Sequence, residues 1–428
     1  MDLALLTALR TPAGAALLAQ IGPYDQRRAL VLGAQLRAQH PPDLVAAALT
    51  QARLRTRARD KFGADASRMW FTPAGLEQAT RPEVAARRAA RVAGLESGSG
   101  HQVLADRVAD LGCGLGADTL ALARAGLQVL AVERDPLTAA LARANVAELG
   151  LADRVEVRLA DVTDPGLVEE VTRTCAAVFT DPARRTAAGR RLDPEGWSPP
   201  WSWVRALSLR VPALAAKVSP GIAHDAIPAG AEAEWVSVSG DVVEAVIWCG
   251  ALAGGASGAR VAGGASEARV AGGLREARRR ATLLPGPHEL TSDALTTPAV
   301  APPGRWLYEP GSAVIRAGLV AHVATAVDGW LIDPTIAYVS ADRHVPTPFA
   351  TAYEVTDVLP FSLKRLRAVL RERLVGTVVV KKRGSAIEPE QLRRQLRPHG
   401  PNSAIVVLTR VAGAPTVLLA RSPEADGA

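Results

Sequence analysis

The sequence has few cysteines and no long apolar run, and each absence excludes a class of protein. Three cysteines in 428 residues cannot form a disulfide framework, and their wide spacing excludes a cysteine metal cluster. Charged residues or prolines interrupt every apolar stretch before the roughly 18 residues that a membrane span requires. Asp2 and Arg10 break the pattern of a signal peptide, which favours an amphipathic helix at the N-terminus. We therefore expect a cytoplasmic protein without a metal or a membrane partner.

Lysine is also scarce, since five lysines stand against 45 arginines. Together with abundant alanine and glycine, this ratio indicates a GC-rich genome rather than a selected guanidinium surface. The net charge is +7, but residues 361–400 alone carry eleven Lys or Arg against three Glu. The whole positive excess therefore lies in one segment. Such segregation favours a surface that faces a polyanion.

Length and pattern predict several domains. A chain of 428 residues exceeds one ordinary core, and 48% hydrophobic against 22% charged residues excludes a disordered protein. Residues 1–96 have helical periodicity, and a Ser-Gly-Ser-Gly joint at 97–100 follows. Residues 101–297 alternate short strands with helices, apart from a nine-residue repeat at 254–273 that we interpret as a low-complexity loop. A Pro-rich link at 298–303 precedes an α+β module at 304–428.

The middle segment has the rhythm of a parallel, doubly wound α/β sheet. Apolar runs predict five strands, at 107–111, 127–132, 155–159, 176–180 and 214–218. Asp135 and Pro136 predict the start of a helix, and Gly150 its end. Two further strands, at 234–239 and 242–249, are expected to be antiparallel. In the last module we expect strands at 312–315, 377–380, 404–408 and 416–419, and helices at 363–375 and 389–396.

A glycine-rich turn between the first strand and its helix is the strongest chemical signal. Gly112, Gly114 and Gly116 allow a ligand to approach the backbone, and the helix start behind them offers free N–H groups. This spacing alone also fits a dinucleotide fingerprint. Acidic residues at four successive strand ends decide between the two: Asp110, Glu133, Asp161 and Asp181. They suit a ligand with an ammonium and a sulfonium group and do not suit a pyrophosphate.

With these residues the sequence resembles the class I S-adenosylmethionine-dependent methyltransferases. The resemblance implies a doubly wound, Rossmann-like sheet and S-adenosylmethionine as the cofactor. It also implies where the cofactor binds: the methionine part at Asp110 and Gly112–Gly116, the ribose at Glu133, and the adenine at Asp161 and Val162.

A finer resemblance extends on both sides of this core. The segment Met69–Pro82 resembles the pre-core region of a bacterial methyltransferase group in which N-terminal helices lead into the cofactor pocket, and it places Thr80 at that pocket. Residues 179–185 and 217–221 resemble that group's fourth- and fifth-strand signatures, and residues 308–318 resemble the start of its THUMP-like domain. The core is also similar to trimethylguanosine synthases and guanine-N2 methyltransferases. THUMP resemblance implies RNA as a partner.

Asp181 and Pro182 match the motif with which amino-methylating enzymes hold an exocyclic amine, so we expect them to be catalytic. Ala183 and Arg184 replace the second proline and the aromatic residue of that motif. Arg184 and Arg185 are therefore candidates for stacking on the base or for binding phosphate. Uridine-C5 enzymes also carry Asp-Pro-Ala-Arg, but they need a cysteine after the fifth strand, where this chain has Ser219.

Two further features bear on RNA. A loop with Trp197, Trp201 and Trp203 either stacks a flipped base or, as we expect, packs onto the sheet. Lys381, Lys382 and Arg383 follow an apolar strand, and they either bind RNA phosphates, as we expect, or belong to a solvated basic face. We expect methylation of a base nitrogen in structured RNA, either rRNA or tRNA. The alternatives are a small-molecule methyltransferase and a protein that binds cofactor and RNA without efficient catalysis.

Overall fold

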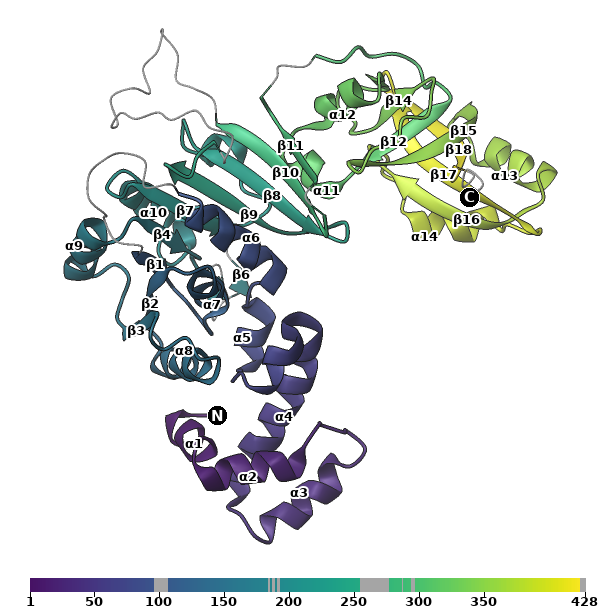
Figure 1. The fold of residues 1–428 in the computed structure, drawn as a ribbon. Helices are drawn as coiled ribbons and strands as arrows, with labels where there is room; N and C mark the ends of the chain where they lie inside the picture. Colours follow the sequence, from purple (N-terminus) through teal and green to yellow (C-terminus); the bar gives the residue numbers. More distant parts are fainter. Residues whose placement is uncertain are drawn as a thin grey trace. The chain divides into compact units, whose positions relative to one another are not determined.

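The structure is a computed structural model, and it describes residues 1–95, 107–183, 185–186, 189–190, 193–254, 277–286, 288–293 and 297–423. The expected joint at 97–100, residues 255–273 of the repeat loop, and Arg184 lie outside these ranges. The chain divides into two compact units (Figure 1). The first comprises residues 1–218, 222–232 and 246–276, and the second comprises residues 219–221, 233–245 and 277–428.

The expected helical region begins the first unit. Its helices are α1 (Leu3–Leu9), α2 (Pro12–Ile21), α3 (Ala29–Arg37), α4 (Pro42–Phe62), α5 (Pro73–Gln78) and α6 (Pro82–Ala93). Local sequence explains where several of them start. The Asp2 carboxylate accepts the N–H of Leu5 at 2.9 Å, and Thr11 accepts that of Gly14 at 3.2 Å. Proline occupies the first turn of α2, α4, α5 and α6, where a missing N–H costs nothing.

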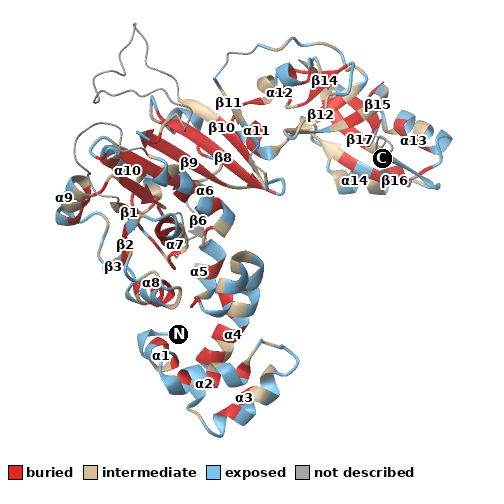
Figure 2. Cartoon of the chain, in the orientation of Figure 1, coloured by how far each residue is buried: buried red, intermediate tan, exposed pale blue. Residues whose placement is uncertain are grey.

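Five parallel strands follow: β1 (Arg107–Leu111), β2 (Gln128–Glu133), β3 (Val155–Leu159), β4 (Ala177–Thr180) and β7 (Ala213–Val218). The connecting helices are α7 (Ala117–Arg124), α8 (Pro136–Glu148), α9 (Pro165–Thr174) and α10 (Trp201–Ser208). In the strand order β3-β2-β1-β4-β7, the chain first adds strands on one side of β1 and then on the other. This order confirms the doubly wound sheet. β4 and β7 are buried along their whole length, as Figure 2 shows. The Asp135 carboxylate caps α8 as expected, accepting the Thr138 N–H at 2.8 Å.

The sheet continues through the two expected closing strands and a further hairpin. The order of all nine strands is β11-β10-β8-β9-β7-β4-β1-β2-β3, with β8 (Glu232–Val238), β9 (Asp241–Gly250), β10 (Arg278–Leu284) and β11 (His288–Thr291). Ser239 and Gly240 join β8 to β9, and both have positive φ, at 52° and 91°. This two-residue connection is typical of an antiparallel hairpin. Two short strands, β5 (Arg185–Thr186) and β6 (Gly189–Arg190), pair separately.

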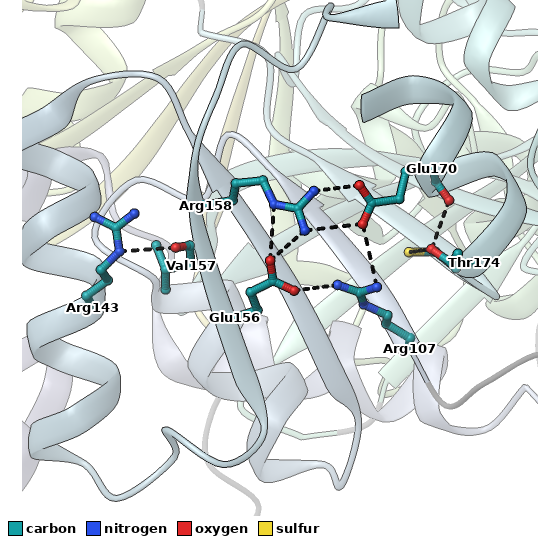
Figure 3. A network of polar contacts seen from close by, with 8 residues as sticks. Arg107, Arg143, Glu156, Val157, Arg158, Glu170 and Thr174 are labelled. Atoms are coloured by element: carbon teal, nitrogen blue, oxygen red, sulfur yellow. Dashed lines mark hydrogen bonds and ion pairs between the residues drawn. The ribbon is translucent and has the colours of Figure 1, made fainter. Parts of the chain in front are cut away.

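A network of ion pairs joins β1, β3 and α9 within the first unit (Figure 3). Arg158 donates to Glu156 at 2.5 Å and to Glu170 at 2.6 Å, and Arg107 donates to Glu156 at 2.6 Å. These side chains are between a quarter and a half exposed, so solvent screens the pairs. The network therefore contributes little to the stability of the fold.

The tryptophans are packed as expected, but only Trp197 lies in a loop, because Trp201 and Trp203 belong to the first turn of α10. Trp197 and Trp201 are 4% and 3% exposed, and their rings meet edge to face at 6.3 Å. The Trp201 indole N–H donates to the Ala226 carbonyl at 3.0 Å. These two side chains therefore belong to the core of the first unit, and only Trp203 of the three is partly exposed.

The second unit contains the expected α+β module. Its seven-stranded sheet has the order β13-β14-β12-β15-β18-β17-β16. The strands are β12 (Trp306–Pro310), β13 (Trp330–Leu331), β14 (Val339–Ala341), β15 (Ala350–Pro360), β16 (Val375–Lys382), β17 (Asn402–Val411) and β18 (Ala414–Arg421). The helices are α11 (Ser312–Arg316), α12 (Val320–Ala326), α13 (Leu363–Glu372) and α14 (Pro389–Leu396). Leu366 and Leu370 of α13 pack with Leu392 and Leu396 of α14 in one apolar cluster.

One expected strand is wrong. Residues 312–315 form α11 and not a strand. Ala313 and Val314 are fully buried. A short apolar run has the same sequence pattern in a buried strand and in a buried helical turn, so the pattern does not distinguish the two. Pro310 ends β12, and the Gly311 N–H donates to the Phe349 carbonyl at 2.9 Å, so the chain turns here before the helix begins.

No single helix among the described residues combines the length and apolar character of a membrane span. The pair α1 and α2, bent by 80° at their junction, reaches that threshold only when the two are counted together.

Candidate active site

The glycine-rich turn has the backbone that its sequence predicts. Gly112, Gly114 and Gly116 all have positive φ, at 90°, 56° and 88°. A side chain would be strained at each position, which explains the choice of glycine. The N–H groups of Gly112 and Cys113 donate to the Val132 carbonyl at 2.9 and 3.0 Å. This contact fixes the turn against the end of β2 and leaves the start of α7 behind it.

Asp110 is a buried carboxylate that lacks one partner. Its Oδ2 accepts the Thr119 hydroxyl at 2.5 Å, whereas Oδ1 has no hydrogen-bond partner among the described residues. Burial raises the pKa of Asp110 to about 7, and the nearby charges of Asp118 and Asp181 add to the effect. A buried polar atom without a partner is costly, so this position is suited to a cationic ligand.

Glu133 is held in place by backbone N–H groups. Oε2 accepts from Gly114 at 3.1 Å, and Oε1 accepts from Arg134 at 2.8 Å and Asp135 at 2.9 Å. A carboxylate offers about four lone-pair sites, so the group retains capacity for a further donor. Glu133 thus joins the end of β2 to the glycine turn and presents a fixed acceptor.

Asp161 and Val162 follow β3, where a turn fixes the aspartate. Its Oδ1 accepts the Thr163 N–H at 2.8 Å and the Thr163 hydroxyl at 2.6 Å. These hydrogen bonds hold the pKa of Asp161 below its ordinary value. Asp161 is exposed and Val162 is partly buried. Together they provide an ionised acceptor beside an apolar surface.

Asp181 and Pro182 lie directly beside the glycine turn. β4 pairs with β1, with Thr180 opposite Leu111, so Asp181 follows at the carboxyl edge of the sheet. A Cβ on Gly112 would lie 3.6 Å from the Asp181 carbonyl oxygen. The Asp181 carboxylate accepts the Lys217 ammonium at 2.7 Å, and Pro182 is buried. The structure therefore brings Asp110, the turn and Asp181 together.

Thr80 belongs to a buried polar network that reaches Asp181. The Thr80 hydroxyl donates to Asp118 at 2.7 Å and accepts from the Lys217 ammonium at 3.1 Å. Arg88 of α6 pairs with the same Asp118 carboxylate, and its side chain is 3% exposed. Asp118, Arg88 and Lys217 were not among the site residues predicted from the sequence. A lysine within the apolar strand of a chain that contains only five was the signal for the last of these.

The segment before the core is fixed to the glycine turn by buried amides. Asn145 of α8 donates to the carbonyls of Trp70 at 3.2 Å and Leu115 at 2.9 Å. A Cβ on Gly75 would lie 2.7 Å from Leu115, so α5 packs closely on the turn. This packing explains how Thr80, which follows α5, comes to lie at the site.

Three segments match known protein families. Residues 108–191 match a methyltransferase domain, residues 350–422 match a THUMP-like domain, and residues 2–58 match a domain of unknown function. An uncharacterised S-adenosylmethionine-dependent methyltransferase of Mycobacterium tuberculosis is 34% identical over 366 residues, which is 84% of this chain and 90% of that protein. The chain belongs to the S-adenosylmethionine-dependent methyltransferases.

Two further similarities accompany this assignment. A solved structure from Porphyromonas gingivalis, assigned as a methyltransferase, has a TM-score of 0.68 at 19% identity and covers 94% of this chain and 100% of its own. That likeness supports the fold. A 23S rRNA uracil-C5 methyltransferase of Acidithiobacillus ferrooxidans is 48% identical over 58 residues, which is 14% of this chain and 13% of that protein.

The residues of this methyltransferase fit its cofactor. When all are ionised, the cluster of Asp110, Asp118 and Asp181 carries three negative charges against the two positive charges of Arg88 and Lys217. The methionine part of S-adenosylmethionine has an ammonium, a sulfonium and a carboxylate, so it brings one net positive charge. The unpartnered oxygen of Asp110 and the net charge of the cluster therefore match the same cation. Among the described residues, no group of three or more His, Cys, Asp or Glu side chains is arranged for a metal.

Two of the predicted RNA ligands, Lys381 and Lys382, lie within β16 and do not follow it as expected, and Arg383 comes directly after the strand. Lys381 pairs with Glu309 at 2.6 Å, Lys382 pairs with Glu388 at 2.6 Å, and Arg383 lies 3.6 Å from Glu309. All three side chains are about a quarter to a third exposed. Arg185 lies in β5, and the structure describes neither its side chain nor any part of Arg184. Internal carboxylates thus already neutralise part of the strand-end charge.

Proposed function

We propose that this methyltransferase methylates a base nitrogen of structured RNA. The observation that carries the proposal is the position of Asp181 and Pro182, at the end of β4 and against the glycine turn. A target nitrogen held there would face the methyl group of a cofactor bound along the turn.

We assign the cofactor contacts as follows. Asp110 balances the cationic methionine part beside Gly112, Gly114 and Gly116, Glu133 accepts the ribose hydroxyls, and Asp161 with Val162 holds the adenine. Thr80 contributes from the segment before the core. When bound, S-adenosylmethionine supplies an electrophilic methyl group. The hydrogen bonds described above hold the side chains of Asp110, Glu133 and Asp161 in the absence of a ligand, which limits the entropy lost on binding.

Asp181 has the catalytic task in this proposal. Its carboxylate accepts an N–H of the target amine, and a carbonyl of the Asp181-Pro182 segment accepts the second N–H. The nitrogen lone pair would then face the methyl carbon of a bound cofactor. Transfer of the methyl group to the nitrogen would release S-adenosylhomocysteine, and the displaced proton would pass to water. Such catalysis depends mainly on proximity and orientation. Arg184 and Arg185 follow at once and would contact the base or a neighbouring phosphate.

The cysteines argue against covalent attack on a uracil. Cys113, Cys175 and Cys249 are all buried, and burial raises the pKa of each thiol, to about 11 for Cys249. A thiol must ionise to become a nucleophile. Ser219 occupies the position after β7 where a uridine-C5 enzyme requires its cysteine. The short similarity to an rRNA uracil-C5 enzyme therefore supports RNA as the substrate and does not support that reaction.

The THUMP-like domain supports RNA through its basic surface. Lys364 and Arg371 lie on the exposed face of α13, opposite the buried Leu366 and Leu370, and Arg365 is exposed beside them. None of these three cations forms an ion pair with a described residue. Lys381, Lys382 and Arg383 remain candidate phosphate ligands, but they would have to exchange Glu309 or Glu388 for a phosphate. We therefore place the main phosphate contacts on α13.

The test compares modified nucleosides of rRNA and tRNA from a strain that lacks the gene and from its parent, by mass spectrometry. We expect one N-methylated nucleoside to disappear from the deletion strain and to return with the wild-type gene but not with Asp181→Ala. Identical nucleoside profiles in both strains would contradict RNA as the substrate and favour a small-molecule substrate or a protein without catalysis.

A further inference from the structure

Lys217 places an ammonium group inside an apolar strand. β7 reads Ala-Leu-Ala-Ala-Lys-Val and is buried throughout, and the Lys217 side chain is 10% exposed. A buried charge is unfavourable unless it is paired and hydrogen-bonded. Lys217 meets this requirement by donating to Asp181 at 2.7 Å and to Thr80 at 3.1 Å.

The two partners of the ion pair differ in exposure. The Asp181 side chain is 31% exposed, whereas that of Lys217 is 10% exposed. The ammonium therefore contacts the carboxylate from the protein interior and leaves the outer side of the carboxylate open. A buried ion pair often adds little net stability compared with apolar residues of the same volume. The geometry of the pair suggests instead that Lys217 fixes the Asp181 carboxylate as a hydrogen-bond acceptor at the surface.

Thr80 and Asp118 hold the ammonium from the other side. Because the Thr80 hydroxyl donates to Asp118, its lone pairs face Lys217. Asp118 is in turn paired with Arg88, whose guanidinium lies 4.4 Å from the ring centre of Phe179 in β4. The contacts lead from Asp181, which directly follows β4, through Lys217, Thr80, Asp118 and Arg88 to Phe179 within β4. They therefore restrict the ammonium to one position relative to Asp181.

We propose that Lys217 is a positioning residue for methyl transfer. Its ammonium holds the Asp181 carboxylate in the orientation that accepts an N–H of the target amine, and the Thr80–Asp118–Arg88 contacts hold the ammonium. This inference rests on the proposed role of Asp181. Lys217 does not touch the target itself, so its removal acts on turnover through Asp181.

The test measures transfer of a radiolabelled methyl group from S-adenosylmethionine to total RNA from a strain that lacks the gene. We expect Lys217→Met to lower kcat by at least roughly tenfold, while the Kd for S-adenosylhomocysteine stays within about threefold. Lys217→Arg keeps the charge and should recover part of the turnover. In the Asp181→Ala background, Lys217→Met should cause no further loss, because two residues that act as one unit are not additive.

Lys61 offers a matched control. It is a second part-buried lysine of the first unit, and burial together with the charge of Lys217 lowers its pKa to about 8. Its ammonium donates to the Leu76 carbonyl at 3.0 Å and not to Asp181. Lys61→Met removes a similar ammonium without releasing the carboxylate, so we expect kcat to change by less than about twofold.

The outcomes separate the inference from the proposed function. If the wild-type protein labels no RNA, the proposed function fails. If the wild-type protein labels RNA and Lys217→Met keeps its kcat, or if the two losses multiply in the double variant, the positioning role is wrong. Loss of S-adenosylhomocysteine binding would show that Lys217→Met disturbs the pocket as well as Asp181. The neutral pair Asp181→Asn with Lys217→Gln then replaces it: turnover equal to that of Asp181→Asn supports the role, and an added loss overturns it.

Discussion

Asp118 and Thr119 are neighbours in the first turn of α7, and their side chains hold two different acidic sites. Thr119 donates to Asp110 at 2.5 Å, beneath the glycine turn, and Asp118 accepts from Thr80 at 2.7 Å, within the network that leads to Asp181. Both side chains are buried. One helical turn therefore contacts Asp110, the carboxylate that we propose faces the cofactor. Through Thr80 and Lys217 it is also linked to Asp181, the carboxylate that we propose is catalytic.

Asp110→Asn should stabilise the ligand-free protein at pH 8 and weaken cofactor binding. The raised pKa, about 7, means that the folded state holds a proton that the unfolded state has released between about pH 4 and pH 7. The contribution of Asp110 to the free energy of unfolding is therefore complete below about pH 4. It is lost as the pH rises from about 4 to about 7. Each pKa unit corresponds to about 1.4 kcal/mol, so the buried charge costs on the order of a few kcal/mol at pH 8.

Thermal unfolding at pH 8 and pH 5.5 measures this effect. The variant should have the higher Tm at pH 8, and the difference should shrink at pH 5.5, where wild-type Asp110 is protonated. S-adenosylhomocysteine should bind the variant at least about tenfold more weakly at pH 8. A lower Tm of the variant at both pH values would show that Asp110 is a structural carboxylate.

Glu133→Ala should abolish tight binding of S-adenosylhomocysteine, because the ribose hydroxyls lose their acceptor and Gly114 loses a hydrogen-bond partner. We expect calorimetry to show a Kd at least about tenfold higher. Glu156→Ala is the control, since this carboxylate of β3 pairs with Arg107 and Arg158 (Figure 3). Glu156 lies opposite Leu130, three residues before Glu133 in β2. Equal affinity of the two variants, or tight NAD binding by the wild-type protein, would contradict the cofactor assignment.

Asp181→Ala should lower turnover by roughly a hundredfold or more while cofactor affinity stays within a few-fold, because its contact with the amine matters mainly in the transition state. Methyl transfer to RNA from the deletion strain and calorimetry with S-adenosylhomocysteine provide the two measurements. Full turnover in this variant would remove Asp181 from the catalytic residues.

The RNA surface can be located by salt dependence. Lys364, Arg365 and Arg371 lie exposed on α13, whereas Lys381 and Lys382 are already paired with carboxylates. Replacing the three α13 residues with glutamine should flatten the slope of log Kd against log salt. The expected change is about 0.7 to 0.9 for each phosphate that the variant no longer neutralises.

The matched variant replaces Lys381, Lys382 and Arg383 with glutamine. It should change the slope less, because these cations must first leave Glu309 and Glu388. A larger change of slope in this variant than in the α13 variant would indicate that the main phosphate contacts lie at the end of β16. An unchanged slope in both variants would place RNA elsewhere on the protein.

Local patterns predict most of the fold and much of the site. The parallel strands, the cap at Asp135 and the glycine turn each depend on residues within a few positions of one another. The ion pairs of Lys381 with Glu309 and of Lys217 with Asp181 join residues 72 and 36 positions apart. Such partners depend on strand order, so the sequence shows unusual lysines without showing what they contact. The strand predicted at 312–315 is wrong for a related reason, since apolar character alone does not separate a strand from a buried helical turn.

The most direct test of the account is to follow the methyl group itself. The purified protein is incubated with S-adenosylmethionine that carries a trideuterated methyl group and with RNA from the deletion strain, and the nucleosides are identified by mass spectrometry. The account predicts that one N-methylated nucleoside gains the label with the wild-type protein and not with Asp181→Ala. Label in C5-methyluridine, or in no nucleoside, would contradict it.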